Sequence, residues 1–179
     1  MITVQPYDPD WPSTFRDLGS TLRDALGPVA IRIDHIGSTS IPGLAAKPII
    51  DIQVSVTEFD PMEPYRTPLE GLGFQYRDKN PELTKRYFKE PDRSEERTHI
   101  HVRRAGSFSE QFPLLFREYM RCHSDAAVEY AELKQRLAEQ FREDRLAYTE
   151  AKTDFIWKTM QNADRWAQET GWSPGPSDA

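Results

Sequence analysis

Apolar residues recur at helical spacing near the N-terminus and then change to strict alternation. Positions three or four residues apart predict an amphipathic helix that a Gly-Pro pair ends: Phe15, Leu18, Leu22, Ala25 and Leu26. Two apolar strands are predicted next, over residues 31–36 and 49–56. In the second strand Asp51 and Gln53 share one face, while isoleucine and valine fill the other. We therefore expect a sheet with helices on its apolar side and a cleft on its polar side.

The remaining pattern predicts short elements and then a helical C-terminal half. A short helix is expected over residues 63–72, strands over 74–76, 85–88 and 98–102, and a charged loop over 89–97. After Gly106, three amphipathic helices are expected, the last two of them continuous or nearly so. This order predicts an α+β fold, with a small mixed β-sheet packed on helices, in a single domain over residues 1–166. Residues 167–179 are expected to form a flexible tail.

Composition narrows the function classes. The chain has 179 residues and a net charge of −6, without a cluster of lysine and arginine, which argues against binding to extended nucleic acid. The single cysteine, Cys122, excludes an intramolecular disulfide and a cysteine-based zinc site. We predict neither a membrane-spanning segment nor a signal peptide, so a cytoplasmic protein is expected.

The candidate chemistry is concentrated where the first strand runs into the second. Gly37 and Ser38 predict a turn whose backbone N–H groups and hydroxyl can bind phosphate, with Thr39 as a further donor. Asp51 lies on the next strand and could hold a hard divalent cation or act as a general base. Sites of this kind usually carry a second carboxylate two residues later, and that position is Gln53. An ordinary turn, and an aspartate paired with Lys47 or an arginine, are the structural alternatives.

Histidines form a second candidate cluster. His99 and His101 alternate with Ile100 and Val102, so both imidazoles are expected on one strand face. Together with His35, they could bind metal, contact phosphate or move protons. A zinc site would need a third ligand, which His35 or Asp51 could supply, and solvent-facing or hydrogen-bonded histidines are the structural alternative.

Cations are candidates for neutralising a bound anion. Lys47 precedes the second strand, and Arg86 lies on a later one. Arg145, Tyr148 and Lys152 are spaced by three and four residues, so they share a helix face that could close over an anion. Each of these residues could instead be an ordinary surface charge.

Several longer motifs together resemble the GrpB-like family, over nearly the whole chain to about Trp166. The most specific is the long stretch from His35 to Ile52 around the Gly-Ser turn. The others are Tyr7–Pro12 followed by a phenylalanine, Thr98–Val102, Phe116–Arg121, Tyr130–Lys134 and Tyr148–Lys152 before Phe155 and Ile156.

The resemblance implies a nucleotidyltransferase-like fold, in which the Gly-Ser turn cradles a nucleoside triphosphate and strand carboxylates hold Mg²⁺ or Mn²⁺. Gly37 and Ser38 match that turn, and Asp51 matches the first metal carboxylate. Gln53 occupies the second carboxylate position, and the strand of His99 and His101 takes the place of the third. The activity of the family itself is not assigned, so the resemblance implies a fold more firmly than a reaction.

Three hypotheses follow. The first is an enzyme that transfers a nucleotidyl group to, or acts on, a small phosphorylated molecule. In it Asp51, His99 and His101 are catalytic, and nucleotide contacts come from His35, Gly37, Ser38, Thr39, Lys47, Gln53, Arg86 and Lys152. The second is a catalytically degenerate nucleotide- or anion-binding module, which Gln53 favours. The third is a transition-metal enzyme built on the histidine cluster. The sequence does not determine the substrate or the oligomeric state.

Overall fold

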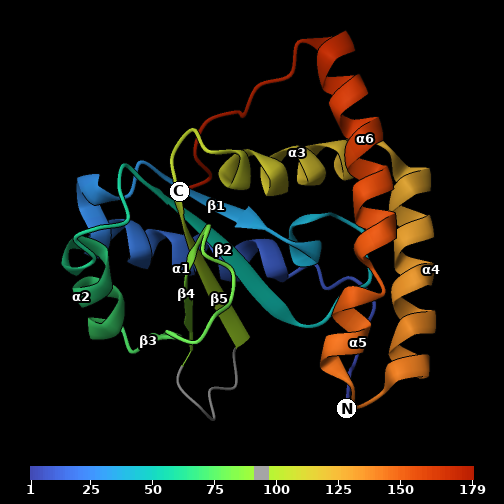
Figure 1. The fold of residues 1–179 in the computed structure, drawn as a ribbon, viewed down its shortest axis with the longest axis horizontal. Helices are drawn as coiled ribbons and strands as arrows, with labels where there is room; N and C mark the ends of the chain where they lie inside the picture. Colours follow the sequence, from blue (N-terminus) through green and yellow to red (C-terminus); the bar gives the residue numbers. More distant parts are fainter. Residues whose placement is uncertain (91–96) are drawn as a thin grey trace.

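The computed structural model describes residues 1–90 and 97–179, so most of the predicted loop over residues 89–97 lies outside the described residues (Figure 1). Its helices are α1 (Trp11–Leu26), α2 (Glu63–Gly71), α3 (Phe108–Cys122), α4 (Ser124–Phe141), α5 (Arg145–Glu150) and α6 (Thr153–Thr170). Short 3-10 turns are η1 (Gly27–Val29) and η2 (Ser38–Ser40). The strands are β1 (Arg32–Ile36), β2 (Ile49–Val56), β3 (Gln75–Tyr76), β4 (Arg86–Lys89) and β5 (Arg97–Arg104).

The five strands form one mixed sheet in the order β1-β2-β5-β4-β3. Only the central pair, β2 and β5, is parallel, and the other neighbours are antiparallel. In the parallel pair Asp51 lies opposite His99, and Gln53 lies opposite His101. Because cross-strand partners point to the same face of a sheet, this register brings the predicted aspartate and both histidines together.

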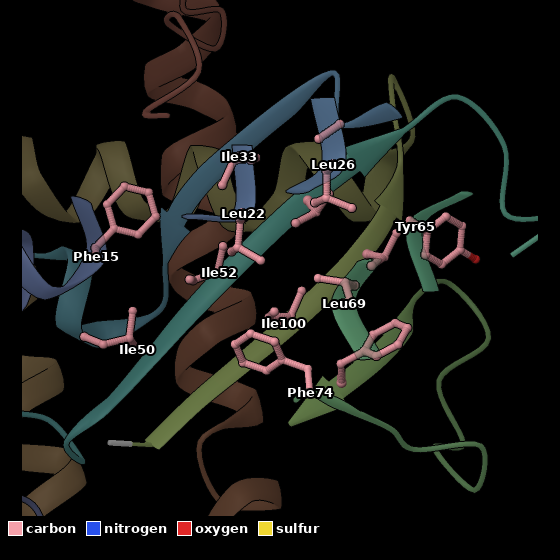
Figure 2. Close-up of a cluster of buried hydrophobic side chains, with 14 of the residues drawn as sticks. Phe15, Leu22, Leu26, Ile33, Ile50, Ile52, Tyr65, Leu69, Phe74 and Ile100 are labelled. Atoms are coloured by element: carbon pink, nitrogen blue, oxygen red, sulfur yellow. The ribbon is translucent and has the colours of Figure 1, made fainter. Parts of the chain in front are cut away.

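The apolar face of the sheet packs against α1 and α2 (Figure 2). Phe15, Leu22 and Leu26 of α1 meet alternate isoleucines of the strands, and Leu69 of α2 packs into the same cluster. α1 begins with Pro12 in its first turn and ends at Gly27, whose positive φ of 51° suits a residue without a Cβ. The predicted N-terminal helix and the predicted strand over 49–56 are both confirmed.

The polar face of the sheet is only partly open. α3 lies across one part of it, and Gln53 and Ser55 have no exposed surface there. Ser107 caps the N-terminus of α3, because its Oγ accepts the N–H of Glu110 at 3.2 Å. The predicted cleft is therefore confined to the part of this face that α3 leaves uncovered.

The C-terminal helices hold the loop between β1 and β2. Met120 of α3 and Tyr130 of α4 pack against Ile41 and Leu44 of that loop. The ring of Tyr130 also stacks on Phe155 of α6, with 5.0 Å between ring centroids. The last two predicted helices are separate elements, because α5 ends at Glu150 and α6 begins at Thr153.

The C-terminal segment differs from the expected flexible tail. α6 continues to Thr170, and the chain then returns to the edge strand β1 (Figure 1). The Oγ of Ser177 accepts the N–H of Ile33 at 2.8 Å, and Oδ2 of Asp178 accepts the N–H of His35 at 2.9 Å. The unpaired edge of β1 offers backbone groups that these residues satisfy. No helix in the described parts of the chain is both long and apolar enough to cross a membrane.

Candidate functional site

Asp51 and two histidines form the centre of the candidate site. Oδ1 of Asp51 lies 3.0 Å from Nε2 of His101 and 3.3 Å from Nδ1 of His99. One oxygen atom on β2 therefore meets two imidazoles from β5. The other ring nitrogens, Nε2 of His99 and Nδ1 of His101, are buried and have no partner among the described residues. One donor atom from each of the three side chains fits within 4.8 Å, which is the arrangement of a candidate metal centre.

The hydrogen bonds of the cluster determine its charge state. Burial by itself would raise the pKa of Asp51, but the bonds from His101 and His99 outweigh it and hold this pKa well below its usual range. Burial lowers the pKa of His101, although its bond to Asp51 acts in the opposite direction. We therefore expect an ionised carboxylate beside a neutral His101 imidazole, and both are forms that can bind a cation.

The Gly-Ser turn lies directly over this carboxylate. Gly37 has a φ of +72°, and a Cβ placed on it would lie 2.7 Å from Oδ2 of Asp51. A glycine is therefore required here both by the backbone conformation and by the close approach of Asp51. Ser38 lines the cavity above the carboxylate. Thr39 also reaches the cavity, but its Oγ1 is engaged by Nε2 of His35 and by the carbonyl of Ile49, each at 3.0 Å.

A cavity of about 460 Å³ opens in front of the cluster and contains three lysines. Lys47 precedes β2, Lys134 comes from α4, and Lys152 comes from the segment between α5 and α6. The amines of Lys47 and Lys152 lie 4.1 and 4.4 Å from the centre of the Tyr148 ring. The amine of Lys134 donates to the carbonyl of Ala45 and lies 4.6 Å from the centre of the Tyr130 ring.

Crowding of these amines makes the cavity an environment that favours anions. Burial and the charge of Lys152 lower the pKa of Lys134 to about 7. Burial and the charge of Lys47 lower the pKa of Lys152 to about 8. A bound anion would offset both the mutual repulsion of the lysine amines and the cost of removing them from water.

Four predicted site residues do not line this cavity: Gly37, which approaches Asp51 as described above, and His35, Arg86 and Gln53. His35 points to the apolar side, where its ring stacks on Phe15 at 4.8 Å between centroids, and burial lowers its pKa to about 4. Arg86 lies on that same side of the sheet, because its cross-strand partner is Val102, whose side chain belongs to the apolar core. The guanidinium of Arg86 pairs with Asp60 at 3.6 Å. Gln53 is on the same face as Asp51, but α3 covers it.

The amide of Gln53 has a structural partner. Its Nε2 donates to the carbonyl of Glu110 at 3.1 Å, in the first turn of α3. The position expected for a second metal carboxylate is therefore an amide that anchors a helix. The expected contribution of Gln53 to binding substrate has no support in this geometry.

Sequence reasoning missed Lys134, the most buried cation of the cavity, together with Tyr87 and Thr149. A signal was present, because Tyr130 and Lys134 repeat the spacing of Tyr148 and Lys152. In both pairs the amine lies over the ring of the tyrosine four residues earlier. Of the helix face predicted to close over an anion, Tyr148 and Lys152 line this cavity and Arg145 does not.

Solved structures share this architecture. The crystal structure of the conserved protein GrpB from Enterococcus faecalis superposes with a TM-score of 0.82 and 31% identity, covering 92% of this chain and 99% of that one. The Cid1 poly(U) polymerase with MgGTP bound superposes with a TM-score of 0.53 and 16% identity, covering 76% of this chain and 44% of that one. The second likeness concerns the fold, which is nucleotidyltransferase-like.

Related sequences and a family match identify the family of the chain. A UPF0157 protein of Pseudomonas aeruginosa is 38% identical over 165 residues, covering 90% of this chain and 67% of that protein. A protein named dephospho-CoA kinase from Mycobacterium tuberculosis is 29% identical over 194 residues, covering 94% of this chain but 47% of its own length. The family described as GrpB protein matches residues 1–162. With a solved GrpB protein of the same fold and a family match over most of its length, the chain belongs to the GrpB family.

Proposed function

We propose that this protein is a metal-dependent enzyme that binds the phosphates of a nucleotide and transfers a nucleotidyl group to a small phosphorylated molecule. One observation carries the proposal: a carboxylate with two histidines and a cluster of three lysines line the same cavity. A divalent cation and a polyphosphate have opposite charges, and these two sets of side chains match them. The nucleotidyltransferase-like fold is consistent with this pairing.

The donor set favours Mn²⁺ over Mg²⁺, the two ions expected from the family resemblance. Mg²⁺ prefers oxygen ligands, whereas imidazole suits transition metals, and this cluster provides one carboxylate and two imidazoles. Asp51, His99 and His101 would hold the ion, and when bound it would supply Lewis-acid stabilisation of phosphoryl charge. Zinc remains an outcome that the experiments below distinguish.

The lysines account for the remaining charge. In nucleotidyl transfer, an acceptor oxygen forms a bond to the α-phosphorus, and the bond from that phosphorus to the bridging oxygen breaks. Pyrophosphate then leaves with the bonding electrons. A hydroxyl acceptor would release its proton to water, whereas an ionised phosphate oxygen has no proton to lose. Lys134, Lys152 and Lys47 would bind the phosphates and stabilise the leaving pyrophosphate. A volume of about 460 Å³ lies within the usual range of small-ligand pockets.

Calorimetric titration with a non-hydrolysable nucleotide, α,β-methylene ATP, tests the proposal. We expect binding that strengthens with Mn²⁺, and more weakly with Mg²⁺, and that Asp51→Asn abolishes the dependence on metal. Arg86→Gln is the matched control, because Arg86 lies on the other side of the sheet and should leave binding unchanged. Pyrophosphate release from the four nucleoside triphosphates then tests transfer, with dephospho-CoA among the acceptors because relatives carry that kinase name. Absence of binding with any metal would overturn the proposal, and stoichiometric zinc in the purified protein would instead favour a transition-metal enzyme.

A second candidate is an anion-binding module without turnover, and the position of Gln53 favours it. Two-metal transfer uses several anionic oxygen ligands, and the described residues offer one carboxylate in the metal cluster. Nucleotide binding that does not depend on metal, without pyrophosphate release, would support this candidate over the enzyme.

A further inference from the structure

A second cavity, of about 360 Å³, adjoins the one described above. The two cavities share four lining residues: Lys47, Ile49, His99 and Thr149. His99 therefore borders both, and it is one of the two histidines of β5 that contact Asp51. A ligand in the second cavity would therefore lie beside the metal cluster and next to the cavity proposed for the nucleotide phosphates.

The second cavity is lined by cations. Lys47, Lys89, Arg97 and Arg145 contribute to its wall, and among the described residues no carboxylate does. Arg97 is paired with Glu90. Lys47, Lys89 and Arg145 have no carboxylate within ion-pair distance in the parts of the chain that the structure describes.

These uncompensated charges disfavour the empty state. Burial and neighbouring Arg97 lower the pKa of Lys89, and burial and neighbouring Arg145 lower the pKa of Lys47. Apolar side chains of Ile2, Pro48 and Ile49 complete the wall, which strengthens electrostatic interactions inside it. A nucleobase would instead need an aromatic platform, and among the described residues this cavity has no tryptophan, tyrosine or phenylalanine in its lining.

We propose that the second cavity binds the phosphate group of the acceptor, so that the acceptor is a phosphate monoester rather than a neutral alcohol. Lys89 and Arg145, which line only the second cavity, together with Lys47 at the border of the two cavities, suit a dianionic phosphate better than a monoanionic carboxylate. The inference rests on the proposed function for the identity of the ligand as an acceptor. The existence of a second anion site does not depend on it and can be tested alone.

The first experiment uses inorganic phosphate as the probe on the full chain without nucleotide, measured by ³¹P NMR titration. The second-cavity variants are Arg145→Gln and Lys89→Gln. The control is Lys152→Gln, which removes a cation from the first cavity only and should weaken only the phosphate that binds there. We expect each second-cavity variant to weaken phosphate binding about tenfold, because each removes one charge-assisted contact. Thermal melting should show that all three variants remain folded. A single phosphate site that all three variants weaken equally, or no effect of Arg145→Gln and Lys89→Gln, would overturn the second site.

The second experiment repeats the phosphate titration with the protein saturated with α,β-methylene ATP and Mn²⁺. We expect phosphate still to bind, and Arg145→Gln to weaken phosphate while changing nucleotide affinity less than about twofold. Competition between phosphate and the nucleotide would mean that the two cavities hold one ligand, which contradicts an acceptor site. Failure of the nucleotide analogue to bind, with phosphate binding still sensitive to Arg145→Gln, would overturn the proposed function and leave the anion site standing.

Discussion

Asp51 and Gln53 are two residues apart on the same face of β2, yet they have different surroundings. The side chain of Asp51 is 27% exposed and lines the lysine cavity, whereas Gln53 is fully buried under α3. The carboxylate of Asp51 is contacted by the ring nitrogens of two histidines, whereas the amide of Gln53 donates a hydrogen bond to the carbonyl of Glu110 in α3. The comparison shows that alternation along a strand selects the candidates for a site, while the covering helix decides which of them can meet a ligand.

The same comparison explains the missing second carboxylate. The buried amide of Gln53 has one hydrogen bond, from its Nε2, and its Oε1 has no partner among the described residues. An unpaired carboxylate in the same place would cost more, because it also buries a charge. Gln53 therefore suits its position under α3. Four predictions test this division of the polar face and the cavity beside it, from the largest expected effect to the smallest, and a fifth concerns the stability of the ligand-free protein.

Asp51→Asn should cause the largest change. It keeps the shape of the side chain but removes the charge that is proposed to bind a cation. We expect the rate of nucleotidyl transfer to fall about a thousandfold, corresponding to about 4 kcal/mol of transition-state stabilisation. Pyrophosphate release measures the rate, and circular dichroism checks that the fold is kept. Full activity in Asp51→Asn would remove Asp51 from the site.

Gln53→Glu should destabilise the protein rather than restore a metal ligand. Its carboxylate would be buried beside the carbonyl of Glu110, so we expect a loss of about 3 kcal/mol in the free energy of unfolding. Gln53→Met is the control, with an expected loss of about 1 kcal/mol from the single hydrogen bond. Urea denaturation measures both. A stable Gln53→Glu variant that binds a second Mn²⁺ would show that α3 does not close this position.

Gly37→Ala tests the contact between the turn and Asp51. The added Cβ would meet Oδ2 of Asp51, so we expect a loss of about 2 kcal/mol in stability together with weaker metal binding. Gly43→Ala is a matched control, because Gly43 has a φ of +78° but nothing within 4 Å of an added Cβ. The control should lose about 1 kcal/mol from backbone strain alone, without a change in metal affinity. Equal effects in the two variants would show that the approach of Asp51 is not what requires a glycine at position 37.

The pH dependence of nucleotide binding should be the smallest effect. Lys134 has a folded pKa of about 7 against an ordinary value of 10.5, so in the free protein it loses its proton as the pH rises through 7. We expect nucleotide affinity to fall about tenfold between about pH 7 and pH 8.5, because binding needs the charged amine. Lys134→Arg keeps its charge and should make this part of the profile shallower, which calorimetry at several pH values would show. A slope from Lys152, whose pKa is about 8, should remain. An unchanged slope would assign the titration to another group.

The linkage to stability has a defined sign. Between about pH 7 and 10.5 the unfolded chain holds a proton on Lys134 that the folded protein lacks, so this residue makes stability rise with pH in that window. Below about pH 7 both states are protonated, and the cost of burying the charge is present in full. Lys134→Met should therefore raise the stability of the ligand-free protein at pH 7 and below, and its control is the same substitution at exposed Lys158.

The sequence by itself determined the elements, because hydrophobic periodicity is a local property. The spacing of Phe15 to Leu26 and the alternation along residues 49–56 correspond to α1 and β2. Alternation also predicted that Asp51, His99 and His101 each lie on a polar strand face, and the structure has them there. The parallel register that makes Asp51 and His99 partners is a property of the assembled sheet.

Only the tertiary structure decided which polar residues share the site. His35 and Arg86 resemble site residues in the sequence, but their side chains lie on the helix-packed side of the sheet. Lys134 entered the cavity because α4 packs over the loop between β1 and β2, a long-range contact that no local pattern encodes. Burial, charge crowding and access to ligand depend on which elements cover a face, and those distances arise only when the whole chain is folded.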